Sequence, residues 1–476
     1  MEIRSRFYAG VICVLMLTWT VLQAQITQGF YQSSRLNTHF REGGDPNGET
    51  VVFIHGVLAS SLFWEPVMVR MPQRFHTFAL DMRGFGDSET KPVDATLGMA
   101  DFSEDVYAFL SEQGYVGGGN KIHLAGWSMG GIIAMKYAVD HPETVHSLLL
   151  VDPVPPYGFL ATKDEFGTPN YSDFAGSGAG TVDPEFVQRL AAGDTSTASP
   201  SSPLNIMRNF YFKPPFRPAN EHDLLMEMLK TAVGPGNFPG DFDPSANWPF
   251  VAPGDSGTQN AFSPKYGDVS SGLINIPNKF PVLWIRGADD LVISDSSFFD
   301  LGYLATQGLL PPGLQNTWPG DSIFPAQPMD SQTRYVLGQY AANGGSYSEV
   351  VIADAAHSPL VEKPDEVTSA YLAFLSTVGV APHPLPGAAR GFRLEANYPN
   401  PFNPGTVIRY EVPRKALVRL EVYNLAGQRI RTLVNQILSA GSYTAQFDGK
   451  GIPSGVYLYR LQAGGISITR KMVLLK

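Results

Sequence analysis

The chain contains a single cysteine in 476 residues, Cys13, and it lies in an apolar stretch near the N-terminus. One cysteine cannot form an intramolecular disulfide bond or a cysteine-based zinc site. If the apolar stretch is removed during export, the mature protein has no cysteine, and thiol catalysis is excluded as well. Any catalytic nucleophile must therefore come from another residue type.

Charge is also scarce, because only 16% of the residues are charged and the net charge is −10. Such a balance predicts no basic groove, so we expect no nucleic-acid partner. The hydrophobic content of 43% favours a folded protein over a disordered one. The length predicts two folded domains plus processing segments.

The chain has one apolar run that resembles a targeting signal, at residues 8–22. Two arginines precede the run, and Ala24 offers a small residue at a cleavage point, as in a secretory signal peptide. The run is short for a membrane-spanning helix, and polar residues follow it at once. We therefore predict a signal peptide over 1–24, export, and no stable membrane span after its removal.

Short apolar runs alternate with helical patterns from about residue 50 onward. The runs are β-branched or aliphatic and end in Gly, Asp or Ser, which is typical of buried parallel strands. Helix patterns separate them at 100–114 and 129–142. This alternation predicts a doubly wound, mostly parallel α/β sheet, with reactive groups at the C-terminal strand ends. The predicted strand segments are TVVFIHG, HTFALDMRG, IHLAGWS, VHSLLLVDP, FPVLWIRGADD and YSEVVIADAAH.

Two insertions interrupt this pattern within the predicted domain 25–379. Residues 154–278 are rich in Pro, Gly and Ser, and only EHDLLMEMLKTAV is clearly helical. An insertion at this point of the sheet would cover the active-site edge as a lid. A second, irregular insertion at 300–345 would either extend the substrate pocket or pad the edge of the fold.

Beyond a Pro/Gly/Ala linker at 380–391, helical periodicity gives way to alternating patterns. Residues 392–476 therefore predict an all-β, sandwich-like domain. This part carries 12 Lys+Arg against 4 Asp+Glu, whereas the rest carries 22 against 40. A basic module joined to an acidic one indicates two parts with different functions.

The segment LAGWSMGG holds the pattern G-x-S-x-G around Ser128. A predicted strand precedes it and a predicted helix follows it, as a nucleophilic serine on a strand-to-helix turn requires. Met129 begins the helix, so its N–H is free to face a developing oxyanion. Ser128 is the predicted nucleophile; the alternative is a small residue in a tight turn.

The loop after the predicted strand TVVFI should supply a second oxyanion donor, and the N–H of Val57 fits this role. His55 precedes it and is expected to orient the loop rather than to act in catalysis. Together with Trp64, the turn DMRGFGDS and GWSMGG, these residues resemble the α/β-hydrolase family over about 50–379. The resemblance implies that family's fold and acyl-transfer chemistry.

The family's order of serine, acid and histidine guides the remaining assignments. Its G-x-x-D spacing selects Asp290 as the acid, with Asp289 as a near alternative that fits a turn or helix cap better. Asp152 is a weaker candidate, because a turn before Pro153 also explains it. The base should follow the last strand, where His357 fits best. No pattern indicates a cofactor or a metal.

The tail begins with NYPNPFNPGT and continues with several ordered motifs that resemble a type A sorting domain of the type IX secretion system. The resemblance covers about 392–476. It implies binding to the type IX machinery and delivery to the surface or the exterior of a Gram-negative bacterium. A surface-binding β module and a stabilising appendage are the alternatives.

Three functions are consistent with these residues. The first is a secreted ester hydrolase with Ser128, Asp290 and His357 as its triad. The second is another reaction of the same triad, such as C–C bond hydrolysis, lactone opening or peracid formation. The third is a non-catalytic surface-binding protein, which an intact triad disfavours. Dehalogenases and epoxide hydrolases use an aspartate where this chain has Ser128.

Overall fold

The computed structural model describes residues 26–378 and 393–475, apart from 398, 413–414, 426, 439–440 and 465. The predicted signal peptide 1–24 and the predicted linker 380–391 lie outside the described residues. Within the described part, no helix has the length and apolar character needed to cross a membrane.

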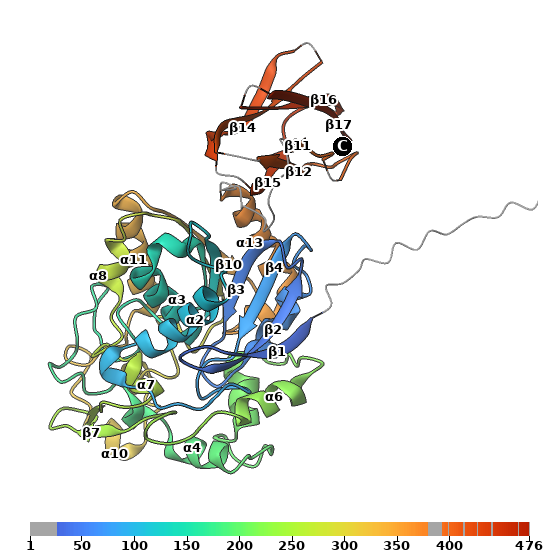
Figure 1. The fold of residues 1–476 in the computed structure, drawn as a ribbon. Helices are drawn as coiled ribbons and strands as arrows, with labels where there is room; N and C mark the ends of the chain where they lie inside the picture. Colours follow the sequence, from blue (N-terminus) through green and yellow to red (C-terminus); the bar gives the residue numbers. More distant parts are fainter. Residues whose placement is uncertain are drawn as a thin grey trace, which may run out of the picture.

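The first domain is built on an eight-stranded sheet with the order β1-β2-β4-β3-β5-β6-β9-β10 (Figure 1). Each of the six predicted strand segments forms one of its six parallel strands, from β3 to β10, which confirms the predicted fold class. The strands are β1 (Thr27–Gln32), β2 (Asn37–Gly44), β3 (Glu49–Ile54), β4 (Phe75–Leu80), β5 (Ile122–Trp127), β6 (Val145–Val151), β9 (Pro281–Gly287) and β10 (Ser346–Ile352).

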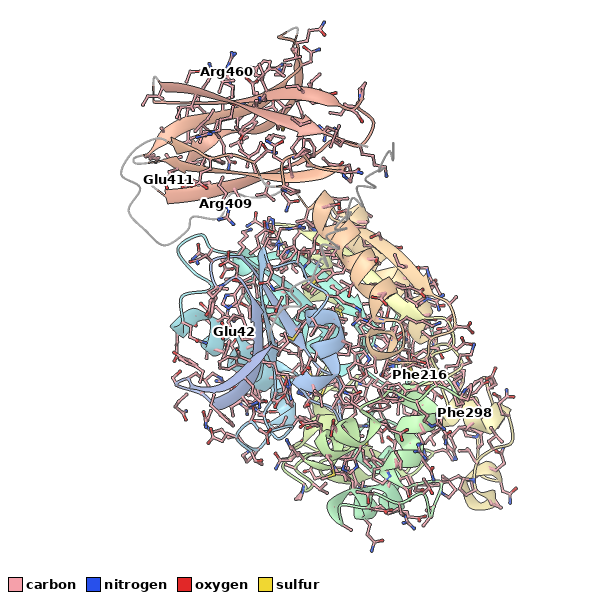
Figure 2. All side chains as sticks on the ribbon, turned by 90° about the vertical axis from the view of Figure 1, so that its right-hand side faces the viewer. Glu42, Phe216, Phe298, Arg409, Glu411 and Arg460 are labelled. Carbon is pink, nitrogen blue, oxygen red and sulfur yellow. The ribbon has the colours of Figure 1, made fainter. Side chains whose placement is uncertain are left out.

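Sequence analysis did not predict β1 and β2, which extend one edge of the sheet as antiparallel strands. Their sequences are largely polar and β1 is mostly exposed, so neither strand has the apolar run that marks a buried one. Polar pairing holds the edge in place: Glu42 on β2 (Figure 2) lies 2.6 Å from His76 Nε2 on β4.

Side chains of the sheet divide between two cores, as a strand period of two requires. On β3, Val51 and Phe53 face one core, whereas Val52 and Ile54 face the other. Helices cover both faces (Figure 1): α2 (Ala100–Glu112), α3 (Met129–Asp140), α8 (Ser270–Ile274) and α11 (Met329–Ala342) on one, and α1 (Glu65–Met68), α12 (Pro359–Glu362) and α13 (Pro364–Thr377) on the other.

Short elements joined by loops form the predicted lid. The predicted helix is α6 (Glu221–Leu229), and α4 (Pro184–Ala191) is an additional helix with Asp183 as its N-cap. The other lid elements before α8 are η4 (Ala179–Thr181), α5 (Pro203–Ile206), the π-helical turn η5 (Met207–Tyr211), β7 (Phe242–Pro244), β8 (Val251–Pro253) and α7 (Thr258–Ala261). Apolar side chains of α4, η5 and α6 belong to the same core cluster as α13, so the lid packs directly on the domain.

The second insertion is helical rather than irregular. It contains α9 (Leu301–Thr306), α10 (Pro312–Gln315) and the 14-residue α11, which covers the sheet beside α8. Sequence analysis missed α11 because its apolar stripe is interrupted by polar residues that are themselves buried, Gln332 and Thr333. Gln332 is satisfied by hydrogen bonds to Thr162 and to Gln327 within the protein.

The C-terminal part folds as two antiparallel sheets that share one core cluster. One sheet has the order β11-β12-β15 and the other β14-β13-β16-β17. Their strands are β11 (Arg393–Leu394), β12 (Gly405–Val412), β13 (Ala416–Tyr423), β14 (Arg429–Leu438), β15 (Gly441–Asp448), β16 (Gly455–Ala463) and β17 (Ile466–Leu474). These two sheets confirm the all-β prediction.

Candidate active site

Ser128 lies at a sharp reversal of the chain between β5 and α3. Its backbone angles are φ 57° and ψ −121°, a conformation that costs a non-glycine residue about 1–3 kcal/mol. The side chain is 4% exposed. A strained conformation of this kind persists only where the surrounding structure imposes it, and such positions cluster at functional sites.

Two glycines permit the reversal. A Cβ atom on Gly126 would lie 2.0 Å from the carbonyl oxygen of Gly130, and one on Gly130 would lie 2.2 Å from the carbonyl oxygen of Ile54. Both obstacles are backbone atoms, which cannot move aside as a flexible side chain could. Glycine is therefore required at both positions for steric reasons, as the sequence pattern indicated.

The structure brings Ser128, His357 and Asp290 together at the C-terminal edge of the sheet. Nε2 of His357 lies 2.9 Å from Ser128 Oγ, and Nδ1 of His357 lies 2.8 Å from Asp290 Oδ2. The other Asp290 oxygen accepts the N–H groups of Val292 and Ile293 at 2.7 and 3.1 Å. All three side chains are buried. The carboxylate is thus fixed in the geometry that orients a histidine base.

Trp127 is a site residue that sequence analysis missed. Its indole N–H donates to the carbonyl oxygen of His357 at 2.6 Å, and its ring lies 5.5 Å from the imidazole. It also stacks on Phe63 at 5.3 Å. The residue before Ser128 therefore anchors the loop that carries His357. Its position inside the G-x-S-x-G pattern is the sequence feature from which this role could have been predicted.

The two alternative carboxylates occupy other positions. Asp289 forms an ion pair with Lys213 Nζ of the lid at 2.8 Å. Asp152 lies under the site, where its Oδ1 accepts the N–H of Gly287 at 2.9 Å. Burial and the negative charge of Asp290 raise the pKa of Asp152 well above its usual range. Both effects favour the protonated form of Asp152, and Asp290 is the carboxyl group that contacts the histidine.

The two predicted oxyanion donors flank the serine. Met129 is the first residue of α3, so its N–H has no acceptor within the helix. In the range 26–378, neither this N–H nor that of Val57 has a hydrogen-bond acceptor. His55 is buried and its Nε2 accepts the N–H of Met82 at 2.9 Å, while burial lowers its pKa. His55 is a neutral, structural residue of this loop, as expected.

Asp81 fixes the same loop from the turn 81–88. Its Oδ1 accepts the N–H of Ser61 at 2.6 Å, and its Oδ2 lies 2.7 Å from His39 Nδ1. Burial would raise the pKa of Asp81, but the hydrogen bonds with His39 and with the backbone N–H of Asp87 lower it to about 2. His39, Asp81 and Asp87 form the one group of possible metal ligands in the described part of the chain. Its hydrogen bonds to the backbone explain it without a metal.

A cavity of about 320 Å³ opens above Ser128 and His357. Its walls are mainly aliphatic or aromatic, with Thr181 and Gln259 as polar exceptions, and Asp183 is the only carboxylate among the described residues that line it. Asp183 is exposed and caps α4, so its charge lies at the surface. The lid contributes Phe159, Leu160, Phe186, Ile206, Phe210, Tyr211, Phe238 and Phe262, and the second insertion with the loop before it contributes Phe298, Phe299, Leu301 and Leu304. The second insertion therefore extends the pocket.

The sequence matches two family descriptions. Residues 49–195 match the alpha/beta hydrolase fold, and residues 396–475 match a secretion system C-terminal sorting domain. The second match marks this protein as secreted or exposed at the cell surface, as predicted.

Its curated relatives are distant. A pimeloyl-(acyl-carrier protein) methyl ester esterase of Aeromonas hydrophila is 32% identical over 22% of this chain and 37% of its own length. A carboxylesterase of Bacillus subtilis is 30% identical over 27% of this chain and 42% of its own. The chain thus spans less than half the length of these relatives.

A solved esterase structure from Thermogutta terrifontis is also similar, with a TM-score of 0.43 and 19% identity over 74% of this chain and 99% of that one. Taken together, the family matches and the observed sheets identify the chain as an alpha/beta hydrolase fold domain followed by a C-terminal type IX secretion sorting domain.

Proposed function

We propose that this protein is a secreted serine hydrolase that cleaves carboxylic esters through an acyl-enzyme intermediate. The observation that carries the proposal is the buried chain of hydrogen-bond distances from Asp290 through His357 to Ser128, which opens into an apolar cavity. The esterase relatives favour this reaction over other chemistry on the same triad. A non-catalytic role offers no reason for such a chain of contacts.

In this proposal Ser128 Oγ attacks the ester carbonyl while His357 Nε2 takes its proton. The Asp290 carboxylate stabilises the imidazolium that forms, and the N–H groups of Val57 and Met129 stabilise the oxyanion. His357 then gives the proton to the departing alcohol. In the second half, His357 removes a proton from water, which attacks the acyl group. His357 then gives this proton to Ser128 Oγ as the acyl–oxygen bond breaks and the carboxylic acid leaves.

The proposed substrate carries an uncharged, apolar acyl group. The cavity volume of about 320 Å³ equals roughly ten water molecules, which is room for a short or medium chain. A negatively charged acyl terminus would lose its hydration in these walls without gaining a lysine or arginine partner among the described lining residues. We also propose 25–379 as the catalytic domain, with 154–278 as its lid and 300–345 as its second insertion.

Substitution of the nucleophile tests the reaction. The full chain should hydrolyse p-nitrophenyl butyrate, and Ser128→Ala should lower kcat at least about 1,000-fold, because the nucleophile is gone. A fluorophosphonate should label the native chain at one site and leave the variant unlabelled. Unchanged turnover in Ser128→Ala would exclude this serine as the nucleophile. Labelling without ester turnover would keep the nucleophile and redirect the substrate search.

A pair of matched substitutions tests which carboxyl group is the acid. Asp290→Asn should lower kcat by about 1,000-fold or more, since the amide cannot stabilise an imidazolium. Asp152→Asn should stay within about tenfold of the native enzyme, because the neutral amide can still accept the N–H of Gly287. Steady-state kinetics at pH 7 check both variants. The reverse order of effects would assign the acid to Asp152.

A substrate series tests the pocket. From acetate to hexanoate esters, kcat/KM should rise by up to about fourfold per methylene group. The reason is that burial of each methylene group contributes about 0.8 kcal/mol of transfer free energy. A hemisuccinate ester should react about 100-fold more slowly than the butyrate ester, since its carboxylate has no partner in the cavity. Equal rates for the neutral and charged esters would contradict the proposed substrate class.

Deletion tests the proposed role of 392–476 as the segment read by the type IX machinery. In a host with this machinery, a chain lacking these residues should accumulate in the periplasm, whereas Ser128→Ala should be exported normally. Cell fractionation followed by immunoblotting measures both. Normal export of the shortened chain would refute the role.

A further inference from the structure

One turn of the lid contacts three separate parts of the candidate active site. The turn comprises residues 207–213 and begins with the π-helical segment η5. Single π-helical turns are rare, and they occur frequently at functional sites. Phe212 is buried in the core shared with α13, and Phe216 beside it lies near the junction of the lid with the C-terminal helices of the domain (Figure 2). The buried side chain of Phe212 therefore anchors the turn in the core of the domain.

The first contact is made by Tyr211, which lies against the oxyanion loop. Its hydroxyl group donates to the carbonyl oxygen of Val57 at 2.8 Å, and its ring lies 5.8 Å from Trp127 and 6.0 Å from His357. Burial raises the pKa of Tyr211, so its proton stays in place at neutral pH. Because the bond fixes the peptide that follows Val57, it restrains the direction of the proposed oxyanion donor.

The second contact is made by Lys213, whose ammonium group joins two loops. Its Nζ lies 2.8 Å from Asp289, the neighbour of Asp290, and 2.7 Å from Asp354, three residues before His357. The hydrogen bonds to Asp289 and Asp354 raise the pKa of the lysine. One cation thus bridges the loop of the proposed acid and the loop of the proposed base.

The third contact runs through the buried carboxylate of Glu362. Its Oε1 accepts the backbone N–H of Lys213 at 2.6 Å, and its Oε2 accepts the N–H of Ala356 at 2.8 Å. Ala356 precedes His357 in the chain. Burial raises the pKa of Glu362 to about 7, although the two hydrogen bonds oppose this shift. A single carboxyl group therefore ties the lid turn to the backbone beside the histidine.

We propose that the lid turn 207–213 is a positioning element of the proposed active site, in which Tyr211 sets the oxyanion loop and Lys213 with Glu362 sets the loops of Asp290 and His357. This inference rests on the proposed function for its effect on rate, but the positioning itself is independent of it. Stability alone does not account for the arrangement, because a half-exposed ion pair such as that of Lys213 contributes little to folding.

Glu362→Gln tests the carboxylate bridge. The amide keeps the shape of the side chain, but only its oxygen can accept, so one of the two backbone N–H groups loses its partner. Amide hydrogen exchange in peptides covering 287–293 and 354–360 should become faster than in the native full chain. Esterase kcat should fall about tenfold or more, with KM within about twofold. Unchanged exchange in both peptides would overturn the proposal.

Two matched pairs of variants test the other contacts. Lys213→Met should accelerate exchange in the same peptides and lower kcat, whereas Lys230→Met, which removes a lid lysine paired with Asp87 and Glu227, should do neither. Tyr211→Phe should lower kcat about tenfold, because the Val57 carbonyl loses its donor. Tyr371→Phe removes a buried hydroxyl group that has no hydrogen-bond partner among the described residues, and it should have no effect on kcat.

The outcomes separate this inference from the proposed function. Faster exchange in the Glu362 and Lys213 variants, together with a native chain that hydrolyses no ester, would retain the positioning role and reject the esterase. Native esterase activity with unchanged exchange and kcat in the Tyr211, Lys213 and Glu362 variants would retain the esterase and reject the positioning role. An equal loss of activity in Lys230→Met would show a general effect of the lid and would also overturn the inference.

Discussion

The reversal of the backbone at Ser128 is the constraint on which the rest of the site depends. It forces a left-handed conformation on a residue with a side chain, and it packs β5 and α3 so closely that Gly126 and Gly130 admit no Cβ atom. The surrounding sheet must therefore be well formed before the serine can be presented. The hydrogen-bond distances among Ser128, His357 and Asp290 follow from the parallel strands β5, β9 and β10, because those strands end at the same edge of the sheet.

Sequence reasoning reached the sheet and the three central side chains for a common physical reason. Parallel strands buried on both faces are apolar throughout, so each strand end is visible as a change to polar residues, and Ser128, Asp290 and His357 lie at or just after such changes. The polar edge strands β1 and β2 have no such boundary. Tyr211, Lys213 and Glu362 each contact a partner far away in the sequence, and no local pattern marks them. Trp127 could have been predicted as a site residue, because it lies inside the recognised G-x-S-x-G motif.

The lid combines two physical roles in one segment. Its apolar side chains share a core with the sheet and α13, which anchors the lid, and others of its apolar side chains form the pocket walls. Hydrogen bonds fix the loop that carries Val57, where the lid meets the sheet. Asp81 accepts the N–H of Ser61 in this loop, and Tyr211 of the lid turn donates to the carbonyl oxygen of Val57. Packing thus fixes where the lid lies, and a few buried hydrogen bonds fix how the loops beneath it are directed.

The second insertion lines the cavity but does not carry the proposed catalytic side chains. It begins and ends on neighbouring parallel strands, β9 and β10, and these strands keep their register although many residues lie between them. Leu301 and Leu304 reach the cavity from this insertion, while Asp290 and His357 stay on the strand-end loops that flank it. A replacement of this insertion would therefore alter the shape of the cavity without displacing the proposed catalytic groups. Exchange of this insertion, in evolution or by protein engineering, would therefore alter the substrate preference.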